Sequence, residues 1–248
     1  MVDIHCHILP GIDDGPKSWD ITAEMCRMAA ADGITHIAAT PHCNDEYPYD
    51  RERYIEMLGQ LSDAAEGKLA FSLGCDLHFS YDNVQDAMEH PRRYTIGDSP
   101  YLLVEFSDFG IPPAVRQNLL AISSCGMVPI ITHPERNRPL LNKPEMVLEF
   151  VEQGCLVQIT ANSLTGYWGS RSRSMAEWLL QRQAVHVVAT DAHDPAHRKP
   201  VLSEARKVVT ELAGEAVANE LFVRAPAAIV DGRSLYDPAP VDELNLDA

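Results

Sequence analysis

Seven short apolar segments, separated by stretches of helical spacing, limit the folds that this chain can adopt. The segments are rich in Val, Ile and Leu, as expected of strands that are buried on both faces. Between them, apolar residues recur at intervals of three and four, which is typical of helices packed on a sheet. We expect strands at residues 2–8, 34–39, 70–74, 101–106, 127–132, 156–160 and 185–190, and helices at residues 18–31, 50–65, 112–125, 144–153, 173–182 and 203–212.

This alternation predicts an α/β fold with a parallel sheet, and seven β/α units favour a TIM-like (β/α)7 barrel over an open sheet. A chain of 248 residues, 46% of them hydrophobic, suits one large domain covering residues 1–248. The tail from about Ala225 contains Pro226, Pro238 and Pro240, and we expect it to be a surface strap or partly disordered.

The formal net charge of -16 argues against a nucleic-acid-binding surface, because phosphate backbones are held by clustered Lys and Arg. An anionic substrate would need a local positive site, and bound metal ions would offset part of the acidity.

The six cysteines occur singly and form no C-x-x-C pair, so we expect reduced thiols that mostly pack in the core. The first residues lack a basic segment followed by a long apolar stretch, and no run of eighteen apolar residues occurs anywhere. We therefore expect a cytoplasmic protein without direct membrane insertion.

Metal-capable side chains follow almost every predicted strand at its carboxyl end. His5 and His7 are two residues apart on the first strand, so both imidazoles point to one face. Active sites of β/α barrels form where the carboxyl ends of the strands meet, which predicts one shared site. Its further candidate ligands are His42, Asp76, Glu105, His133, Asp191 and His193.

Each candidate also has an ordinary structural explanation. Glu105 alone would suit a salt bridge at a strand end, and Asp191 alone would suit a helix N-cap. Isolated histidines are usually structural or exposed, and we keep that interpretation for His36, His78, His90, His186 and His197.

The loop at residues 7–15 brings an acidic residue close to the first histidine pair. Asp14 stands there between glycines that allow the backbone to wrap tightly. The competing interpretation is an ordinary Asp-Gly turn.

Two arginines supply the local positive charge that a substrate phosphate requires. Arg136 and Arg198 follow site histidines closely and can hold a phosphate bidentately, unless they are solvated surface residues. Tyr47, in the loop after His42, is a candidate for contact with a substrate ring, although loop tyrosines are commonly just exposed.

Mixed imidazole and carboxylate ligation suits manganese, iron or zinc. Such ions activate a bound water, polarise a phosphoryl oxygen and stabilise both oxygens of an in-line displacement. The residues therefore predict two to three divalent or trivalent metal ions and metal-assisted hydrolysis.

Six motifs occur in order between Asp3 and about Arg198: D-I-H-C-H-I-L-P-G-I-D-D-G, A-T-P-H, G-C-D-L-H, L-L-V-E-F, T-H-P-E-R and A-T-D-A-H. The set resembles the PHP (polymerase and histidinol phosphatase) superfamily. Within it, the motifs are similar to the bacterial metal-dependent protein-tyrosine phosphatases of capsular and exopolysaccharide loci.

The resemblance implies a distorted seven-stranded barrel of the PHP type. It also implies that a metal-bridging hydroxide attacks a phosphotyrosine, with Arg136 and Arg198 binding the phosphate oxygens. The expected partner is a phosphotyrosine protein, the cytoplasmic tail of a bacterial tyrosine kinase. The implied ligands are His5, His7, Asp76 and Asp191 for one metal, Asp76, Glu105 and His133 for a second, and Asp14, His42 and His193 for a third.

One position departs from the family pattern, which usually has Glu where this chain has Asp76. The shorter side chain would alter the metal spacing or weaken one site. His78, two residues further along the same face of the strand, is a substitute ligand to consider.

Other functions remain open at this point. Hydrolysis of histidinol phosphate or of another small phosphomonoester would use the same metal residues. An amidohydrolase usually carries a bridging lysine at the fourth strand, where this chain has Glu105. A cysteine-dependent phosphatase needs an Arg six residues after its nucleophile, and no cysteine here has one. A metal-stabilised binding protein without catalysis is the non-enzymatic alternative.

Overall fold

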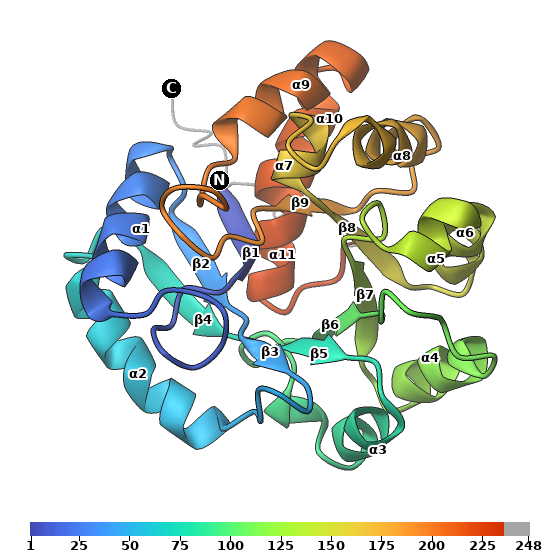
Figure 1. Cartoon of the computed structure of the whole chain (residues 1–248), viewed down its shortest axis with the longest axis horizontal. Coiled ribbons are helices and arrows are strands. Elements are labelled where there is room, and N and C mark those ends of the chain that lie inside the picture. The colour runs from blue at the N-terminus through green and yellow to red at the C-terminus, as the bar shows by residue number, and fades with distance from the viewer. Residues whose placement is uncertain (236–248) are drawn as a thin grey trace, which may run out of the picture.

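The computed structural model describes residues 1–235, in which parallel strands lie at the centre and helices surround them (Figure 1). Each of the seven predicted strands is confirmed, with ends that shift by a few residues. These strands are β1 (Val2–Cys6), β2 (His36–Ala39), β4 (Ala70–Leu73), β6 (Tyr101–Glu105), β7 (Val128–Thr132), β8 (Leu156–Thr160) and β9 (Val187–Ala189).

Two further short strands, β3 (His42–Cys43) and β5 (Asp76–His78), were not predicted. β3 follows β2 after Pro41, which has no N–H to donate to a neighbouring strand. β5 follows β4 after Gly74, where a Cβ atom would lie 2.9 Å from Ile96 Cγ1. Each interruption thus divides one predicted strand region into a first part, β2 or β4, and a short second part, β3 or β5.

The strands form two parallel sheets, a three-stranded sheet in the order β1-β2-β4 and a six-stranded sheet in the order β3-β5-β6-β7-β8-β9. Backbone hydrogen bonds connect the end of β1 to the segment after β9, from His7 N to Ala192 O at 2.9 Å and from Asp191 N to His5 O at 2.8 Å. The α/β class with parallel sheets is thus confirmed.

All six predicted helices are present, as α1 (Trp19–Ala31), α2 (Arg51–Ala64), α4 (Val115–Ser124), α6 (Glu145–Glu152), α8 (Ser170–Gln181) and α9 (Ser203–Ala213). The missed helices are α3 (Tyr81–Glu89), α5 (Arg138–Asn142), α7 (Ala161–Leu164), α10 (Glu215–Asn219) and α11 (Ala225–Val230), with a 3-10 turn at Pro91–Arg93 and a π-helical turn at Glu220–Arg224. α3 is short and buries only Val84 and Ala87, and the Ser80 side chain caps it by accepting from Asn83 N–H.

The hydrophobic core has two parts. The larger part lies between the strands and the surrounding helices, and the smaller part gathers residues from most of the strands around Ile96 and Ile229. Alternating strand residues explain the division, because successive side chains point to opposite faces.

α11 corrects the expectation for the C-terminal tail. Ala225, Pro226 and Ile229 are buried in this helix, so the chain does not become a surface strap at Ala225. Pro238 and Pro240 lie outside the described residues.

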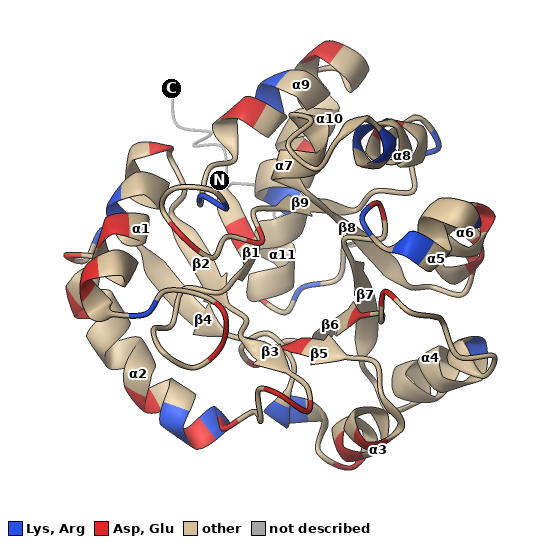
Figure 2. Ribbon diagram, viewed as in Figure 1, with Lys and Arg blue, Asp and Glu red and all other residues tan. Residues whose placement is uncertain are grey.

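Five of the six cysteines are buried and only Cys125 is exposed, all as free thiols, which confirms the expected core-packing role. No helix within residues 1–235 is long and apolar enough to cross a membrane. Acidic residues are spread over several outer helices, among them α1, α2, α3 and α9 (Figure 2).

Candidate active site

The candidate ligands converge at the carboxyl ends of the strands, although they come from segments far apart in the sequence. Three groups of side chains bring their ligand atoms within 4.8 Å of one another. The groups are His7 with Asp14, His42 and His193; His5 with His7 and Asp76; and His42 with Asp76 and Glu105.

The two remaining candidate ligands lie beside these groups. Asp191 Oδ1 is 3.5 Å from His5 Nε2 and 3.5 Å from His7 Nε2. His133 Nε2 is 3.7 Å from Glu105 Oε1. The three groups overlap the sets that the resemblance implies but do not coincide with them, since His42 belongs to two groups. His42 Nδ1 is 3.3 Å from Asp76 Oδ2, and its Nε2 is 3.4 Å from Asp14 Oδ1.

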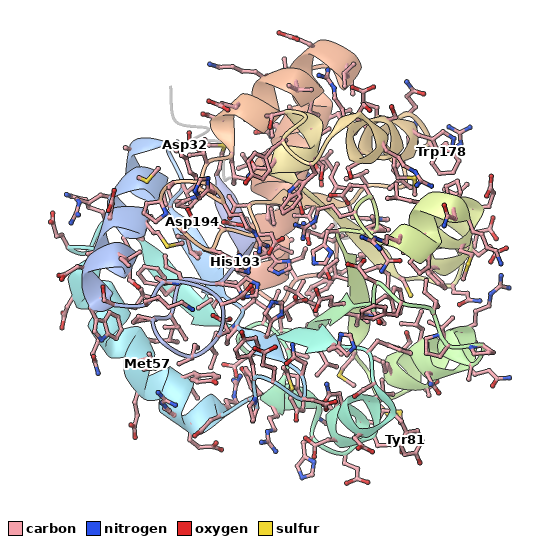
Figure 3. The ribbon with its side chains drawn as sticks, in the orientation of Figure 1. Asp32, Met57, Tyr81, Trp178, His193 and Asp194 are labelled. Atoms are coloured by element: carbon pink, nitrogen blue, oxygen red, sulfur yellow. The ribbon has the colours of Figure 1, made fainter. Side chains whose placement is uncertain are left out.

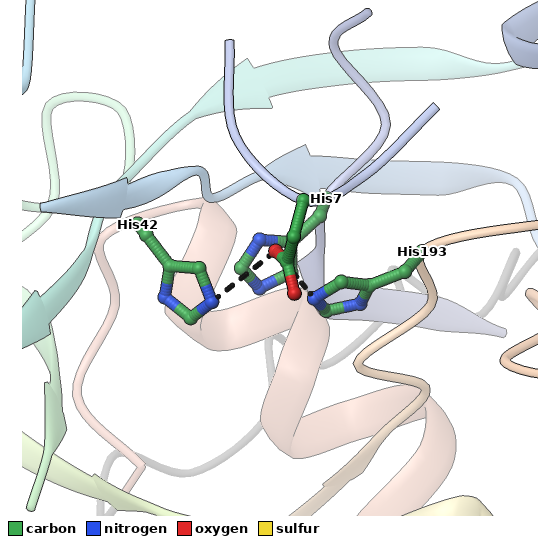
Figure 4. A group of neighbouring side chains, drawn as sticks. His7, His42 and His193 are labelled. Atoms are coloured by element: carbon green, nitrogen blue, oxygen red, sulfur yellow. Dashed lines mark ion pairs between the residues drawn. The ribbon is translucent and has the colours of Figure 1, made fainter. Parts of the chain in front are cut away.

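The loop after β1 wraps closely around the first histidine pair. Gly11 has a φ of 70°, and a Cβ atom at Gly15 would lie 2.5 Å from the His7 carbonyl oxygen. The expected need for glycine is thus confirmed at both positions. Figure 4 shows His7, His42 and His193 converging, and the ion pairs join Asp14 Oδ1 to His42 Nε2 and, at 3.2 Å, to His193 Nε2.

Three histidine rings are oriented by hydrogen bonds at Nδ1, which leaves Nε2 directed at the cluster. His5 Nδ1 lies 2.9 Å from Gln158 Oε1, and His7 Nδ1 lies 2.8 Å from Asp13 Oδ2. His193 Nδ1 lies 3.0 Å from the Asp191 carbonyl oxygen. An acceptor at one ring nitrogen fixes the tautomer and makes the other nitrogen a better metal ligand.

Sequence reasoning did not single out Gln158 or Asp13 for this role. Gln158 lies within β8 and is 153 residues from His5, so no local pattern indicates the contact. Asp13 neighbours the predicted Asp14, and only the fold of the loop shows which of the two faces His7.

Two site residues have backbone conformations that other residues rarely adopt. His133 has a φ of 35° and directly follows β7. Asp191 has a φ of 51° and is the second residue after β9. Left-handed backbone at residues other than glycine costs free energy and is concentrated at functional sites. Both side chains are turned into the cluster at that cost.

The electrostatics of the cluster call for cations among its carboxylates. Burial acts to lower the pKa of His5, but Asp76 and Asp191 outweigh it and raise the pKa to about 9. Burial likewise opposes the rise at His42, whose pKa is raised to about 10 by Asp76 and Glu105. Without other cations, protons on these two rings balance the neighbouring carboxylates.

Two other groups in the cluster have pKa values shifted in favour of their neutral forms. Burial, together with His193 and His42, lowers the pKa of His7 to about 3. Burial and the neighbouring Asp76 raise the pKa of Glu105. His5 and His42 are thus held protonated, whereas His7 and Glu105 are shifted towards their neutral forms. Such mixed shifts are typical of ligands brought together for a metal.

Buried polar atoms without a hydrogen bond support the same conclusion. His42 Nδ1 lies 3.3 Å from Asp76 Oδ2, and His193 Nε2 lies 3.2 Å from Asp14 Oδ1. Even so, Asp76 Oδ2, His42 Nδ1 and His193 Nε2 are buried and make no hydrogen bond. Buried polar atoms are nearly always paired, so these atoms fit ligands of a metal ion. The donor set of imidazoles and carboxylates fits manganese, iron or zinc.

A cavity of about 570 Å³ opens over the cluster. The predicted residues Asp14, His42, Glu105, His133 and Asp191 line it, as do both predicted arginines, Arg136 and Arg198. A larger hollow of about 910 Å³ lies elsewhere and contains none of the predicted site residues.

Both arginines are held by one carboxylate. Arg198 Nη2 lies 2.6 Å from Asp191 Oδ2, and Arg136 Nη2 contacts the same oxygen. Burial acts to raise the pKa of Asp191, but Arg136 and Arg198 outweigh it and hold the pKa well below its usual range. Asp191 thus presents Oδ1 to the histidines and Oδ2 to the arginines.

Tyr47 lies against His42, with ring centroids 6.0 Å apart, but it does not line the cavity. The aromatic residues that do are Phe106, Phe109 and Trp168, and sequence reasoning singled out none of them.

The other histidines are placed as follows. His78 lines the cavity, with Nδ1 3.8 Å from Glu105 Oε2, but it belongs to none of the ligand groups. His36 contacts Ser72, His186 accepts from Val157 N–H, and His90 and His197 are exposed. The structural interpretation of these last four agrees with their positions.

The family described as "Capsular polysaccharide synthesis, CpsB/CapC" matches residues 1–231. The chain belongs to this family. It is 34% identical over 210 residues to the putative tyrosine-protein phosphatase CapC of Staphylococcus aureus, covering 82% of this chain and 81% of the relative. It is 31% identical over 252 residues to the tyrosine-protein phosphatase YwqE of Bacillus subtilis (strain 168), covering 95% and 99% of the two chains.

Solved structures agree with this placement. A chain from the crystal structures of YwqE from Bacillus subtilis and CpsB from Streptococcus pneumoniae, described as metal-dependent tyrosine phosphatases, matches with a TM-score of 0.87 and 29% identity. The match covers 94% of this chain and 96% of that one. Histidinol phosphate phosphatase from Lactococcus lactis, solved with zinc, L-histidinol and phosphate, matches with a TM-score of 0.56 at 11% identity over 86% of this chain and 93% of that one, a likeness of fold alone.

Proposed function

We propose that this member of the CpsB/CapC family is a metal-dependent tyrosine-protein phosphatase. The observation that carries the proposal is a cluster of nine candidate histidine and carboxylate ligands, five of which line one cavity together with an arginine pair. Relatives named as tyrosine-protein phosphatases, two of them matched over nearly their whole length, support the choice of substrate. The two parallel sheets, joined at His7 and Ala192, would together form one distorted (β/α)7 barrel in a single domain.

The proposal divides the candidate ligands among three metals as the family resemblance implies. The first metal would be held by His5, His7, Asp76 and Asp191, the second by Asp76, Glu105 and His133, and the third by Asp14, His42 and His193. When bound, such ions lower the pKa of a coordinated water and polarise the phosphoryl group.

The remaining chemistry belongs to the side chains of the cavity. Arg136 and Arg198 would bind two phosphate oxygens, because each guanidinium carries further N–H donors beyond those that contact Asp191. Their positive charge stabilises the charge that grows on these oxygens in the transition state. The leaving phenolate needs little protonation, since the pKa of tyrosine is near 10, so the site does not require a separate general acid.

The biological partner follows from the family. A capsule-synthesis phosphatase would act on a phosphotyrosine protein, and we propose the cytoplasmic tail of a bacterial tyrosine kinase, reached from the cytoplasm. The negative net charge of the chain makes nucleic acid an unsuitable partner.

Hydrolysis of a phosphotyrosine peptide, compared with histidinol phosphate, tests the substrate. We expect the metal-loaded protein to prefer the peptide, to lose activity with chelator and to regain it with manganese. His7→Ala should abolish the activity, whereas His90→Ala, an exposed histidine outside the cavity, should not change it. Preference for histidinol phosphate would overturn the substrate, and chelator-resistant hydrolysis would overturn the mechanism.

A further inference from the structure

β8 is the one strand of the seven whose carboxyl end carries none of the predicted site residues. The chain instead continues from β8 through α7 into a tight turn before α8. Gly166 and Gly169, both with a φ of 87°, bracket this turn, and Gly169 N donates to Gly166 O at 3.0 Å. The turn presents Trp168 to the cavity.

Trp168 contacts both of the arginines that bind the substrate phosphate in the proposed function. Arg136 Cζ lies 4.5 Å from the centroid of the Trp168 ring, and Arg198 Cζ lies 5.7 Å from it. A guanidinium over an indole ring is held by cation–π attraction and by stacking of the two planes. The ring therefore limits where the two guanidinium groups can lie.

Three buried N–H donors in this contact have no partner. They are Trp168 Nε1, Arg136 Nε and Arg198 Nε, and all three residues line the cavity. Buried donors are nearly always satisfied, so these three atoms mark a part of the cavity wall where polar partners are missing.

Phe109 gives the same cavity an apolar surface. It belongs to the loop between β6 and α4, it lines the cavity, and its side chain is fully exposed. A fully exposed phenylalanine does not pack in the core, so its apolar surface is available to a ligand in the cavity.

We propose that Trp168 and Phe109 form a specificity wall that receives the ring of the substrate, so that the site selects phosphate esters of aromatic alcohols over those of aliphatic alcohols. The proposal rests on the proposed phosphatase function and assigns its selectivity to two residues. A phosphorylated phenol combines a dianion with a flat apolar ring, and the cavity places arginines and aromatic side chains together. Each ring contact should contribute roughly 3- to 10-fold in affinity.

Binding of two non-hydrolysable probes tests this selectivity without turnover. Phenylphosphonate and methylphosphonate share the anionic group and differ in the ring, and titration calorimetry on the metal-loaded protein gives both dissociation constants. We expect the wild-type protein to bind phenylphosphonate at least about 10-fold more tightly. The ratio should fall by roughly 3- to 10-fold in Trp168→Ala and in Phe109→Ala, because one of the two ring contacts is lost in each.

Three variants are matched controls. Trp168→Phe keeps a ring but loses the N–H donor, so it should retain most of the preference. Trp178→Ala removes another tryptophan stacked on an arginine, at 4.0 Å, and Tyr81→Ala removes another exposed aromatic side chain. Neither residue lines the cavity, both lie at the edge of the view in Figure 3, and the ratio should stay at the wild-type value.

An unchanged ratio in folded, metal-loaded Trp168→Ala and Phe109→Ala would overturn the proposal. Phe109 is fully exposed, so its variant decides the question even where Trp168→Ala does not fold. Hydrolysis of phosphotyrosine peptide by a protein that shows no preference for phenylphosphonate would refute the specificity wall and leave the phosphatase function standing. A preference for phenylphosphonate in a protein that hydrolyses no phosphotyrosine would refute the phosphatase function and leave the specificity wall standing.

Discussion

Asp191 joins the two halves of the site at the scale of a single residue. One carboxylate oxygen faces the imidazoles of His5 and His7, and the other pairs with Arg136 and Arg198. A group that contacts both the proposed metals and the phosphate-binding arginines fixes their relative position. Its unusual φ of 51° is the local cost of that arrangement.

Replacing Arg136 by Ala should reduce kcat/KM for a phosphotyrosine peptide by about 10²- to 10³-fold, because the transition-state charge loses a fixed donor. Arg136→Lys should restore little of this, since an ammonium cannot bind two oxygens in a plane. Arg182→Ala, an arginine stacked on Trp178 outside the cavity, is the matched control. Steady-state kinetics measure all three, and full activity in Arg136→Ala would contradict the role.

Asp76→Asn should lower the number of bound metals by about one per chain, because a neutral amide replaces a carboxylate shared by two ligand groups. Elemental analysis of the purified protein measures this. Asp98→Asn changes an exposed carboxylate in the larger, remote hollow and should leave the metal content unchanged. Equal metal content in the two variants would show that Asp76 is not a ligand.

At the scale of elements, the interruptions of two strands shape the site. Pro41 and Gly74 end β2 and β4 early, and the chain then forms β3 and β5 in the second sheet. His42 and Asp76 pair in register there, at the start of the two short strands. This register continues that of β2 and β4, in which Ala39 pairs with Leu73, and the interruptions place the pair beside β6 in the second sheet.

Ile229→Ala tests the contribution of α11. Ile229 is fully buried in the smaller core with residues from several strands, so truncation should lower the free energy of unfolding by about 3 kcal/mol. Leu212→Ala, a half-exposed leucine in α9, should cost far less. Urea unfolding measures both, and equal midpoints would mean that α11 does not contribute to the core as described.

At the scale of the whole molecule, stability should depend on metal. The proposed ions would bind the folded state, in which the ligands meet, and their removal would leave the buried carboxylates balanced only by protons on His5 and His42. Chelation should therefore lower the Tm by roughly 10 °C, and manganese should restore it. Calorimetric scans measure the change, and an unaltered Tm after proven metal removal would contradict a structural contribution of the ions.

The pH dependence of stability should include a contribution from His186, far from the metals. Burial lowers its pKa to about 4, from about 6.5 in the unfolded chain, so the unfolded state takes up the proton first. The contribution of neutral His186 to the free energy of unfolding is fully present above about pH 6.5. It is lost as the pH falls to about 4, by up to about 3 kcal/mol.

His186→Gln should remove that part of the slope, and His90→Gln, an exposed histidine, should keep it. Urea unfolding of the chelated proteins between pH 7 and 4.5 measures the difference. Parallel curves for wild type and His186→Gln would rule out this contribution.

The sequence by itself determined the seven main strands and the six main helices, because apolar periodicity is a local property of the chain. It also placed His5 and His7 on one face, since alternation along a strand needs no tertiary information. Most of the candidate ligands could be named because they lie at the carboxyl end of a predicted strand or a few residues beyond it.

Only the tertiary structure decided which side chains complete the site. Gln158 meets His5 across 153 residues, and Trp168 meets Arg136 through a turn that has no metal-capable residue. The burial of α11 could not be predicted from the sequence, because the segment is short and its Ala and Pro residues are also common at the surface. Such contacts depend on how the sheets are joined, and the free energy that selects them comes from packing between elements and not from the pattern within any one of them.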